Sequence, residues 1–318
     1  MSSRVLVALG GNAILQPGQK GTAVEQLANI THTVEQLLDI VEKGYELVLT
    51  HGNGPQVGAI LIQNEMSREQ VPAMGLDFCG AESQGFIGYM LCQVLHNECM
   101  ARGLKKDAVC VVTQVEVNPD DKAFSAPTKP VGPFYSQAEA ELRMAQRGER
   151  WIEDAGRGWR KVVPSPEPKN VIEKEVIREL VDRGFIVVAS GGGGIPVCRD
   201  AQGRLYGVEA VIDKDLAGER LAQDVHADTF VILTDVPNAI LNYNTPHQMP
   251  LGKVTIEEME KYVEEGHFRA GSMGPKVQAA LRFVKDGGDR AIIARLDQVL
   301  AALKGEAGTQ IVSETDQE

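Results

Sequence analysis

The sequence predicts an α/β fold, a three-layer αβα sandwich around a mainly parallel open sheet. Short runs rich in β-branched residues alternate along the chain with longer helical patterns. The short runs are apolar on both faces, which is typical of central parallel strands that helices cover on each side. Such an alternation implies right-handed βαβ units, and the sequence shows no repeat of solenoid length.

These patterns predict the main strands and helices. The expected strands cover Arg4–Leu9, Tyr45–Thr50, Ala108–Thr113, Phe185–Ser190, Thr229–Thr234 and Arg290–Ala294. The expected helices cover about Val24–Lys43, Pro55–Met66, Ala81–Arg102, Val171–Asp182, Leu216–Val225 and Pro275–Asp286. After Gly305 we expect one more strand, at the edge of the sheet, and then a frayed acidic tail.

Residues 118–168 interrupt this alternation. The segment is rich in Pro, Gly and charged residues, and it contains both tryptophans, Trp151 and Trp159. A plain surface excursion would explain the segment, but the prolines around Lys129 favour an arm that is held in position. We therefore expect one domain over residues 1–318, with a projecting lid subdomain of short strands at residues 118–168.

Composition argues against several classes of function. The 318 residues carry a formal net charge of -12, whereas a broad nucleic-acid surface needs a basic patch. A few lysines that converge on one cleft can still bind a small anion. The six histidines form no HxH or HxxxH pair, so we expect no zinc site built by the protein.

Cysteine usage and the N-terminus predict a cytoplasmic protein. The five cysteines form no CxxC pair and their number is odd, which is typical of a reducing compartment. The start MSSRVLVALGG lacks the basic and apolar regions of a secretion signal. No stretch approaches the ~20 apolar residues that span a membrane. We therefore expect neither a membrane nor a nucleic acid among the partners.

Glycine-rich turns follow three of the expected strands, at the edge where parallel sheets bind their ligands. Backbone N–H groups in such turns can approach an anion closely, and the N-terminus of a following helix adds its positive dipole end. Each turn alone is a weak signal, but together they predict a phosphate site. The turns are Gly10-Gly11-Asn12, Gly52-Asn53-Gly54 followed by Pro55, and Ser190 to Gly194.

Two lysines stand at positions where a charge is costly. Lys276 falls in the first turn of an expected helix, where its charge opposes the helix dipole unless both share an anion. Lys214 lies between Asp213 and Asp215 in an otherwise apolar run, where charges must be paired or used. A structural ion pair is one reading of Lys214, and we weigh a functional role higher.

Phosphoryl transfer is the chemistry that these features favour. The chain has no Walker A pattern and no kinase HRD or DFG set. The spacing of Gly52, Gly54 and Gly58 has one residue too many for a dinucleotide fingerprint, which argues against a dehydrogenase. Separate lysines suffice, because the step mainly needs in-line positioning and neutralisation of charge. We predict an ATP-using phosphotransferase for a small acidic substrate.

The motifs together resemble the amino-acid kinase family, and within it the carbamate kinases. Many members of the wider family carry a lysine just before the first glycine pair, where this chain has Val7-Ala8-Leu9. The resemblance implies that Lys214 fills that role, and the PTKPVG arm is similar to carbamate kinases and not to acetylglutamate kinase. The matching segments run through almost the whole chain: VALGGNA, LTHGNGPQVG, CGAESQGFIGYM, PTKPVGPFY, DAGRGWRKVVPSP, SGGGGIPV, VIDKDLA, LTDVPNA and GSMGPK.

The resemblance implies a reaction and its partners. ATP and carbamate would exchange a phosphoryl group with ADP and carbamoyl phosphate, usually in the direction of ATP during arginine breakdown. Mg²⁺ would arrive with the nucleotide, with no metal held by the protein alone. The N-terminal half would mainly bind carbamate or carbamoyl phosphate, and the C-terminal half mainly ATP or ADP. A homodimer would form by sheet continuation and helix packing.

The resemblance also implies roles for single residues. Lys214 and Lys276 would neutralise the transferring phosphoryl group, and Asp215 would orient them. Lys129 would close over the acyl-phosphate site. The substrate and phosphate groups would be held by Gly10, Gly11, Asn12, Gly52, Asn53, Ser190, Gly191 and Gly192. The nucleotide would lie against Thr234, Asp235, Val236, Tyr243, Met273 and Gly274.

Two alternatives stay open at this point. One is a kinase of the same fold for another small acid, such as acetylglutamate kinase or a nucleotide-monophosphate kinase. The missing first-strand lysine and the PTKPVG arm argue against it. The other is a non-catalytic regulatory module that binds a nucleotide. Such a module would be expected to lose Lys214, Lys276 or a glycine pair, and all of these are present.

Overall fold

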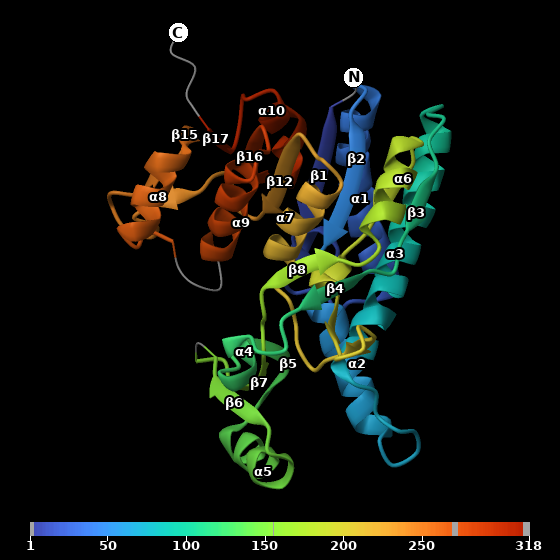
Figure 1. The fold of residues 1–318 in the computed structure, drawn as a ribbon, viewed down its shortest axis with the longest axis vertical. Helices are drawn as coiled ribbons and strands as arrows, with labels where there is room; N and C mark the ends of the chain where they lie inside the picture. Colours follow the sequence, from blue (N-terminus) through green and yellow to red (C-terminus); the bar gives the residue numbers. More distant parts are fainter. Residues whose placement is uncertain (1–2, 155, 269–272, 314–318) are drawn as a thin grey trace.

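An eight-stranded sheet forms the centre of the computed structural model, which describes residues 3–154, 156–268 and 273–313 (Figure 1). The strands lie in the order β15-β17-β16-β12-β1-β2-β9-β3. All neighbours pair in parallel except β16 and β17, so the αβα fold with a mainly parallel open sheet is confirmed. The bounds are β1 Arg4–Leu9, β2 Glu46–His51, β3 Ala108–Cys110, β9 Ile186–Val188, β12 Thr229–Thr234, β15 Lys253–Thr255, β16 Arg290–Arg295 and β17 Thr309–Val312.

The expected edge position of the last strand is wrong. β17 is an inner strand, because β15 pairs with it in parallel on its outer side, with Val254 opposite Ile311. β15 has only three residues, which is too short for a hydrophobic pattern to reveal from the sequence. The tail that we expected to fray begins outside the described residues.

Helices cover both faces of the sheet, as its two-sided apolar strands require. Alternate strand residues separate the two cores: Val5 and Val7 face α1, α3 and α10, whereas Leu6 and Ala8 face α6, α7, α8 and α9. The bounds are α1 Ala23–Glu42, α2 Gly54–Ser67, α3 Leu76–Ala101, α6 Lys174–Asp182, α7 Lys214–Asp224, α8 Ile256–Glu264, α9 Met273–Lys285 and α10 Val299–Leu303.

The starts of α3, α7 and α6 differ from the expected ones because of contacts that the structure shows. α3 begins five residues early, at Leu76, whose N–H donates to the Glu209 carboxylate (2.8 Å). α7 begins at Lys214, because the Asp213 carboxylate accepts the N–H of Asp215 (2.9 Å) and caps the helix. α6 begins three residues late, because residues 168–171 pair as a strand instead.

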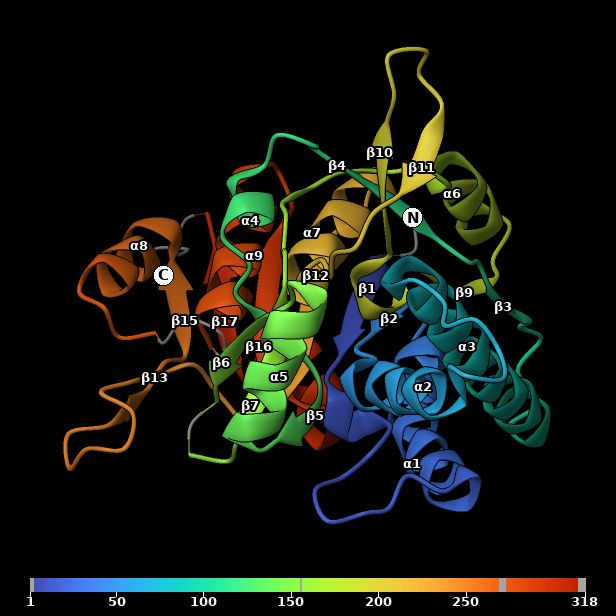
Figure 2. The same ribbon diagram turned by 90° about the horizontal axis from the view of Figure 1, so that it is seen from below.

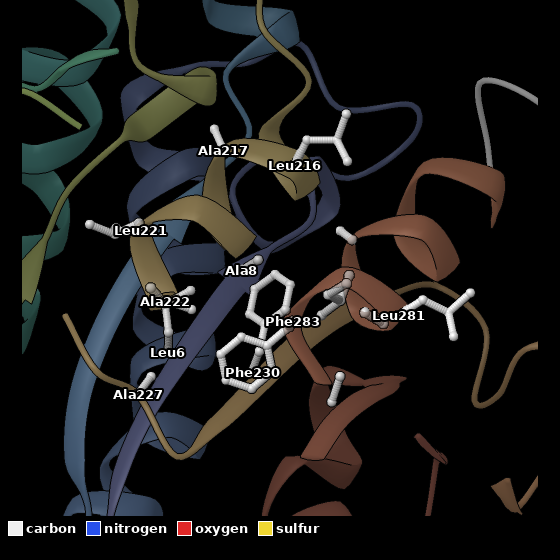
Figure 3. Close-up of a cluster of buried hydrophobic side chains, with 14 of the residues drawn as sticks. Leu6, Ala8, Leu216, Ala217, Leu221, Ala222, Ala227, Phe230, Leu281 and Phe283 are labelled. Carbon is white, nitrogen blue, oxygen red and sulfur yellow. The ribbon is translucent and has the colours of Figure 1, made fainter. Parts of the chain in front are cut away.

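The core between α7, α9 and the sheet holds these two helices side by side (Figure 3). Phe230 of β12 packs against Phe283 of α9, with 5.6 Å between the ring centroids. Leu221 and Ala222 of α7 and Leu6 of β1 belong to the same cluster. Truncation of one such buried aromatic residue typically costs about 3–5 kcal/mol. The packing therefore fixes the positions of the two helices, α7 and α9, whose first turns carry Lys214 and Lys276.

Two smaller sheets lie beyond the carboxyl ends of the central strands. One has the order β11-β10-β4-β8, with bounds Leu205–Gly207, Ile195–Arg199, Gln114–Val117 and Pro168–Val171. The other is antiparallel, in the order β5-β7-β6, with bounds Lys129–Tyr135, Trp159–Val163 and Arg150–Glu153. Together with α4 (Lys122–Ser125) and α5 (Gln137–Arg147) it forms the projecting unit of residues 118–168, called the insertion below (Figure 1).

The insertion lies beside α2, as the views in Figures 1 and 2 agree. Gly132 of β5 approaches Gly58 of α2, and Glu65 of α2 binds Arg147 of α5 (2.9 Å).

No helix in the described part of the chain is long and apolar enough to cross a membrane. Short elements complete the fold: β13 Ile240–Leu241, β14 Met249–Pro250 and the 3-10 turns Gly11–Ala13, Gly191–Gly193 and Leu296–Gln298.

Candidate active site

A cavity of about 330 Å³ lies where the glycine turns meet the insertion. β1, β2 and β9 are consecutive in the sheet, so their carboxyl ends meet at one edge. Gly11, Gly52, Asn53 and Gly192, from all three glycine turns, line the cavity. Gly10, Asn12, Ser190 and Gly191 belong to the same turns but do not line it.

The third turn needs glycine at its centre. Gly192 has φ +68°, a left-handed conformation that favours glycine, and a Cβ atom there would overlap the side-chain amide of Asn53. Asn53 is itself held by a hydrogen bond from its Nδ2 to the Ser83 Oγ (2.8 Å). The backbone of this turn therefore lies directly against the turn that follows β2.

Two lysines from different helices share one buried carboxylate beside the cavity. The Lys214 Nζ lies 2.5 Å from one oxygen of Asp215, and the Lys276 Nζ lies 3.1 Å from the other. Asp215 is only 2% exposed. Burial by itself raises the pKa of Asp215, but the two ammonium groups outweigh burial and hold that pKa below its usual value. Asp215 therefore stays ionised and keeps both ammonium groups in place.

A third lysine reaches the cavity from the insertion. Lys129 opens β5, and its Nζ lies 2.8 Å from the Asp213 Oδ2. Lys129, Lys214 and Lys276 all line the cavity, although they lie on three separate elements, β5, α7 and α9. Positive charge from three elements thus converges on one small space, where an anion can bind.

Buried polar side chains behind the turns were missed by sequence reasoning. Gln84 of α3 donates to the carbonyls of Thr113 and Gly191 (3.1 Å each), and its oxygen accepts the Thr113 N–H (2.7 Å). His51 donates from Nδ1 to the Gly52 carbonyl (3.0 Å), and burial lowers the pKa of His51 to about 4, so its ring is neutral at pH 7. A polar residue on the buried face of a helix was the available signal for Gln84.

Arg160 is a further cavity residue that the sequence did not reveal. It lines the cavity from β7, and its guanidinium donates to the carbonyls of Gly132 (3.1 Å) and Pro130 (3.4 Å). These bonds brace the backbone that follows Lys129. Nothing in the sequence separates Arg160 from the other charged residues of the insertion.

The expected nucleotide residues lie outside the cavity. Thr234 ends β12, and Asp235 and Val236 follow it. The Asn12 Nδ2 donates to the Asp235 Oδ1 (2.6 Å), which joins this region to the first glycine turn. Met273 and Gly274 begin α9, directly before Lys276. Tyr243 lies on the turn between β13 and β14 and is 49% exposed.

Comparison with known proteins identifies the family. The sequence model of the amino acid kinase family matches residues 3–295. The chain belongs to the amino acid kinase family. Carbamate kinase from Thermococcus kodakarensis is 56% identical to it, over 98% of this chain and 99% of that protein. Carbamate kinase from Trichomonas vaginalis is 57% identical, over 97% of this chain and 99% of that protein.

Solved structures agree with this assignment. Carbamate kinase from Giardia lamblia bound to AMP-PNP matches this amino acid kinase with a TM-score of 0.92 and 46% identity, over 98% of each chain. A protein from Aeropyrum pernix matches with a TM-score of 0.92 and 39% identity. Among amino acid kinases, the chain thus groups with the carbamate kinases, and the resemblance inferred from its motifs is confirmed.

The departure from the wider family now has a structural counterpart. This amino acid kinase lacks a lysine before Gly10, and the Lys214 side chain lies instead against Gly52, where a Cβ atom would be 3.3 Å from the Lys214 Cδ. The charge therefore reaches the edge of the sheet from the start of α7 and not from β1.

Proposed function

We propose that this amino acid kinase is a carbamate kinase, which transfers a phosphoryl group reversibly between ATP and carbamate. The observation that carries the proposal is the pair of lysines, Lys214 and Lys276, bridged by buried Asp215 beside a cavity of about 330 Å³. Four relatives that share more than half of its residues over almost the whole chain are named carbamate kinases.

The lysine pair suits the transition state of phosphoryl transfer. Negative charge spreads over the transferring group in that state, and fixed ammonium groups stabilise it without reorganisation. Asp215 binds both ammonium groups, so it orients Lys214 and Lys276 and acts as a positioning residue. The backbone N–H groups of the turns at Gly11 and Gly52 would hold the substrate anion and the phosphate oxygens.

The insertion would act as the lid of this site. Lys129 lies on it and lines the cavity, so closure would add a charge to the acyl-phosphate end and exclude water. Water exclusion matters because carbamoyl phosphate decomposes in water. The two halves of the chain would bind different ligands. The substrate would lie mainly on the N-terminal half, and the nucleotide mainly on the C-terminal half, near Asp235 and the start of α9.

The residues of the site fit a nucleotide that brings its own Mg²⁺. In the described part of the chain, no group of three or more His, Cys, Asp or Glu side chains is arranged to hold a metal ion. The carboxylates that line the cavity, Asp213 and Asp215, are both bound to lysines, whereas the lysines and turn N–H groups suit phosphate oxygens. When bound, Mg²⁺ would neutralise phosphate charge of the nucleotide.

Phosphorylation of ADP tests this function. The purified protein is incubated with Mg-ADP and either carbamoyl phosphate, acetyl phosphate or N-acetylglutamyl phosphate, and ATP is measured. We expect rapid formation of ATP with carbamoyl phosphate and slow or no formation with the other two. Preference for N-acetylglutamyl phosphate would establish the acetylglutamate alternative, and no ATP with any donor would refute a kinase of small acids.

The thiols fit a reducing compartment, and we place the enzyme in the cytoplasm. All five cysteines are free. Burial raises the pKa of the Cys79 and Cys92 thiols to about 11 and that of the Cys110 thiol to about 12, so they stay protonated and unreactive at pH 7.

The sheet edge at β3 would form the interface of a homodimer. β3 is the last strand in the sheet order, and the helix that covers it, α3, exposes a row of apolar side chains. A long apolar face beside an unpaired strand edge is typical of an interface between two copies. The row consists of Phe78, Phe86, Tyr89 and Met100, and Val112 lies exposed just after β3.

Replacement of Tyr89 by glutamate is expected to weaken this dimer at least about thirtyfold, since a buried interface aromatic typically contributes 2 kcal/mol or more. Sedimentation velocity over a range of concentrations measures the change. Val263→Glu on α8 is the control, because it also adds a charge at an exposed apolar site but lies at the other end of the sheet. Equal dimerisation of Tyr89→Glu and the wild type would rule out this face.

A further inference from the structure

We propose that Asp213 is a positioning residue that holds the Lys129 ammonium over the cavity and fixes the start of α7 with the same carboxylate. The inference rests on the proposed function, because it concerns how the cations of that site are placed. Asp213 binds Lys129 and a backbone N–H, and it needs no contact with the reacting atoms.

The two oxygens of Asp213 have different partners. Its Oδ1 accepts the N–H of Asp215 (2.9 Å) and caps α7. Its Oδ2 accepts from the Lys129 Nζ (2.8 Å). The side chain is only 17% exposed, so water screens these two contacts little. One carboxylate therefore connects the insertion directly to the helix that carries Lys214.

The capped turn is the part of the helix that the site depends on. Lys214 and Asp215 are the first two residues of α7, and Asp215 in turn holds Lys276 of α9. All three cavity lysines are thus placed by two neighbouring carboxylates. Asp213 sets where Lys129 and the helix start lie relative to each other, which neither element determines alone.

A carboxylate in this position is unfavourable for the substrate unless it has a positioning role. Asp213 lines the cavity, and its negative charge opposes the binding of an anion there. If Asp213 contributed only charge, its neutralisation would strengthen binding of carbamoyl phosphate. If it positions Lys129, neutralisation would slow the reaction instead. The two roles therefore predict opposite changes in kcat/KM for carbamoyl phosphate: a rise if Asp213 contributes only charge, and a fall if it positions Lys129.

Asp213→Asn separates the two functions of the side chain. Asparagine caps a helix about as well as aspartate, so α7 keeps its start, but the charge that holds Lys129 is lost. We expect kcat for the phosphorylation of ADP by carbamoyl phosphate to fall about tenfold, because a misplaced group loses its favourable geometry for the reaction. Asp213→Ala is expected to show the same loss and also a Tm lower by about 2 °C, since the cap is gone.

A double-mutant cycle tests whether the effect passes through Lys129. Lys129→Met, Asp213→Asn and the double variant are compared by kcat and KM. We expect the double variant to match Lys129→Met within about twofold, because Asp213 has no ammonium left to position. Independent losses that multiply, or a wild-type kcat in Asp213→Asn, would overturn the proposal.

Asp200→Asn is the matched control. One oxygen of the Asp200 carboxylate also accepts a hydrogen bond from a backbone N–H, that of Gln202 (2.9 Å). Its other oxygen accepts one from a cationic side chain, at the Arg204 Nε (2.7 Å). It lies on the β10–β11 turn and does not line the cavity. We expect its kcat and KM to equal those of the wild type, and an effect there equal to that of Asp213→Asn would overturn the proposal.

Tryptophan fluorescence gives a readout that does not depend on activity. Both tryptophans of the chain, Trp151 and Trp159, lie on strands of the insertion. Release of Lys129 is expected to increase quenching by acrylamide equally in Asp213→Asn and Lys129→Met. Unchanged quenching in Asp213→Asn would overturn the placement of Asp213 whatever the substrate, whereas a wild type that makes no ATP would overturn only the proposed function.

Discussion

Replacement of Lys276 by methionine is expected to lower kcat about a thousandfold, and Lys214→Met to lower it by a similar factor. Each ammonium group is fixed by Asp215 beside the cavity, at 3.1 Å and 2.5 Å. Methionine keeps an unbranched side chain of similar size and removes the charge, so the loss reports on stabilisation of the transferring phosphoryl group. ATP formed from carbamoyl phosphate and ADP is the measurement.

Lys285→Met provides the control for this experiment. Lys285 lies on the same helix, α9, but it pairs with Glu260 of α8, away from the cavity. We expect its kcat to stay within about twofold of the wild type. If Lys276→Met or Lys214→Met kept near-normal turnover with an unchanged circular dichroism spectrum, the role of that lysine in charge stabilisation would be refuted.

Asp215→Asn is expected to lower the free energy of unfolding at pH 7 by about 3–5 kcal/mol, because it leaves two partly buried ammonium groups without their counter-charge. The pKa of Asp215 lies below its usual value in the folded protein, despite burial, because of Lys214 and Lys276. The carboxylate therefore stabilises the fold above about pH 4 and loses this effect as the pH falls through its lowered pKa. The two proteins should become more alike in stability below pH 4, as urea unfolding at pH 7, 5 and 3.5 will show.

Glu219→Gln, on the same helix, should instead raise the free energy of unfolding at pH 7. Glu219 is also buried in α7, but one of its oxygens lacks a hydrogen bond, and burial raises its pKa to about 7. The unfolded chain ionises this carboxyl near its ordinary pKa of 4.5, so the fold loses stability as the pH rises from about 4.5 to 7, and glutamine removes that cost. A loss of stability in Glu219→Gln as large as that in Asp215→Asn would show that any change of a buried carboxyl in α7 is harmful.

The fold and the kind of chemistry could be predicted from the sequence because they depend on local patterns. The expected strand Arg4–Leu9 coincides with β1, since an apolar run between turns needs no distant information. The three glycine turns could be placed at one edge because parallel strands present their carboxyl ends together. The three-residue strand β15 and the early start of α3 could not, because they depend on β17 and on Glu209, which are distant in sequence.

Partners across the site could not be predicted for the same reason. The positions of Lys129, Lys214 and Lys276 were readable as costly or unusual charges, but the groups that hold them were not. Gln84 is one example: its importance lies in hydrogen bonds to Thr113 and Gly191, which are 29 and 107 residues away.

The sequence by itself determined the αβα class, the glycine turns and the lysines of an amino acid kinase, because each follows from residue type and spacing along the chain. The tertiary structure alone decided that Asp215 is shared by two helices, that Asp213 connects the insertion to α7 and that Arg160 faces the cavity. Electrostatic and hydrogen-bond energies fall steeply with distance, so they depend on which groups the fold brings within about 3 Å of each other.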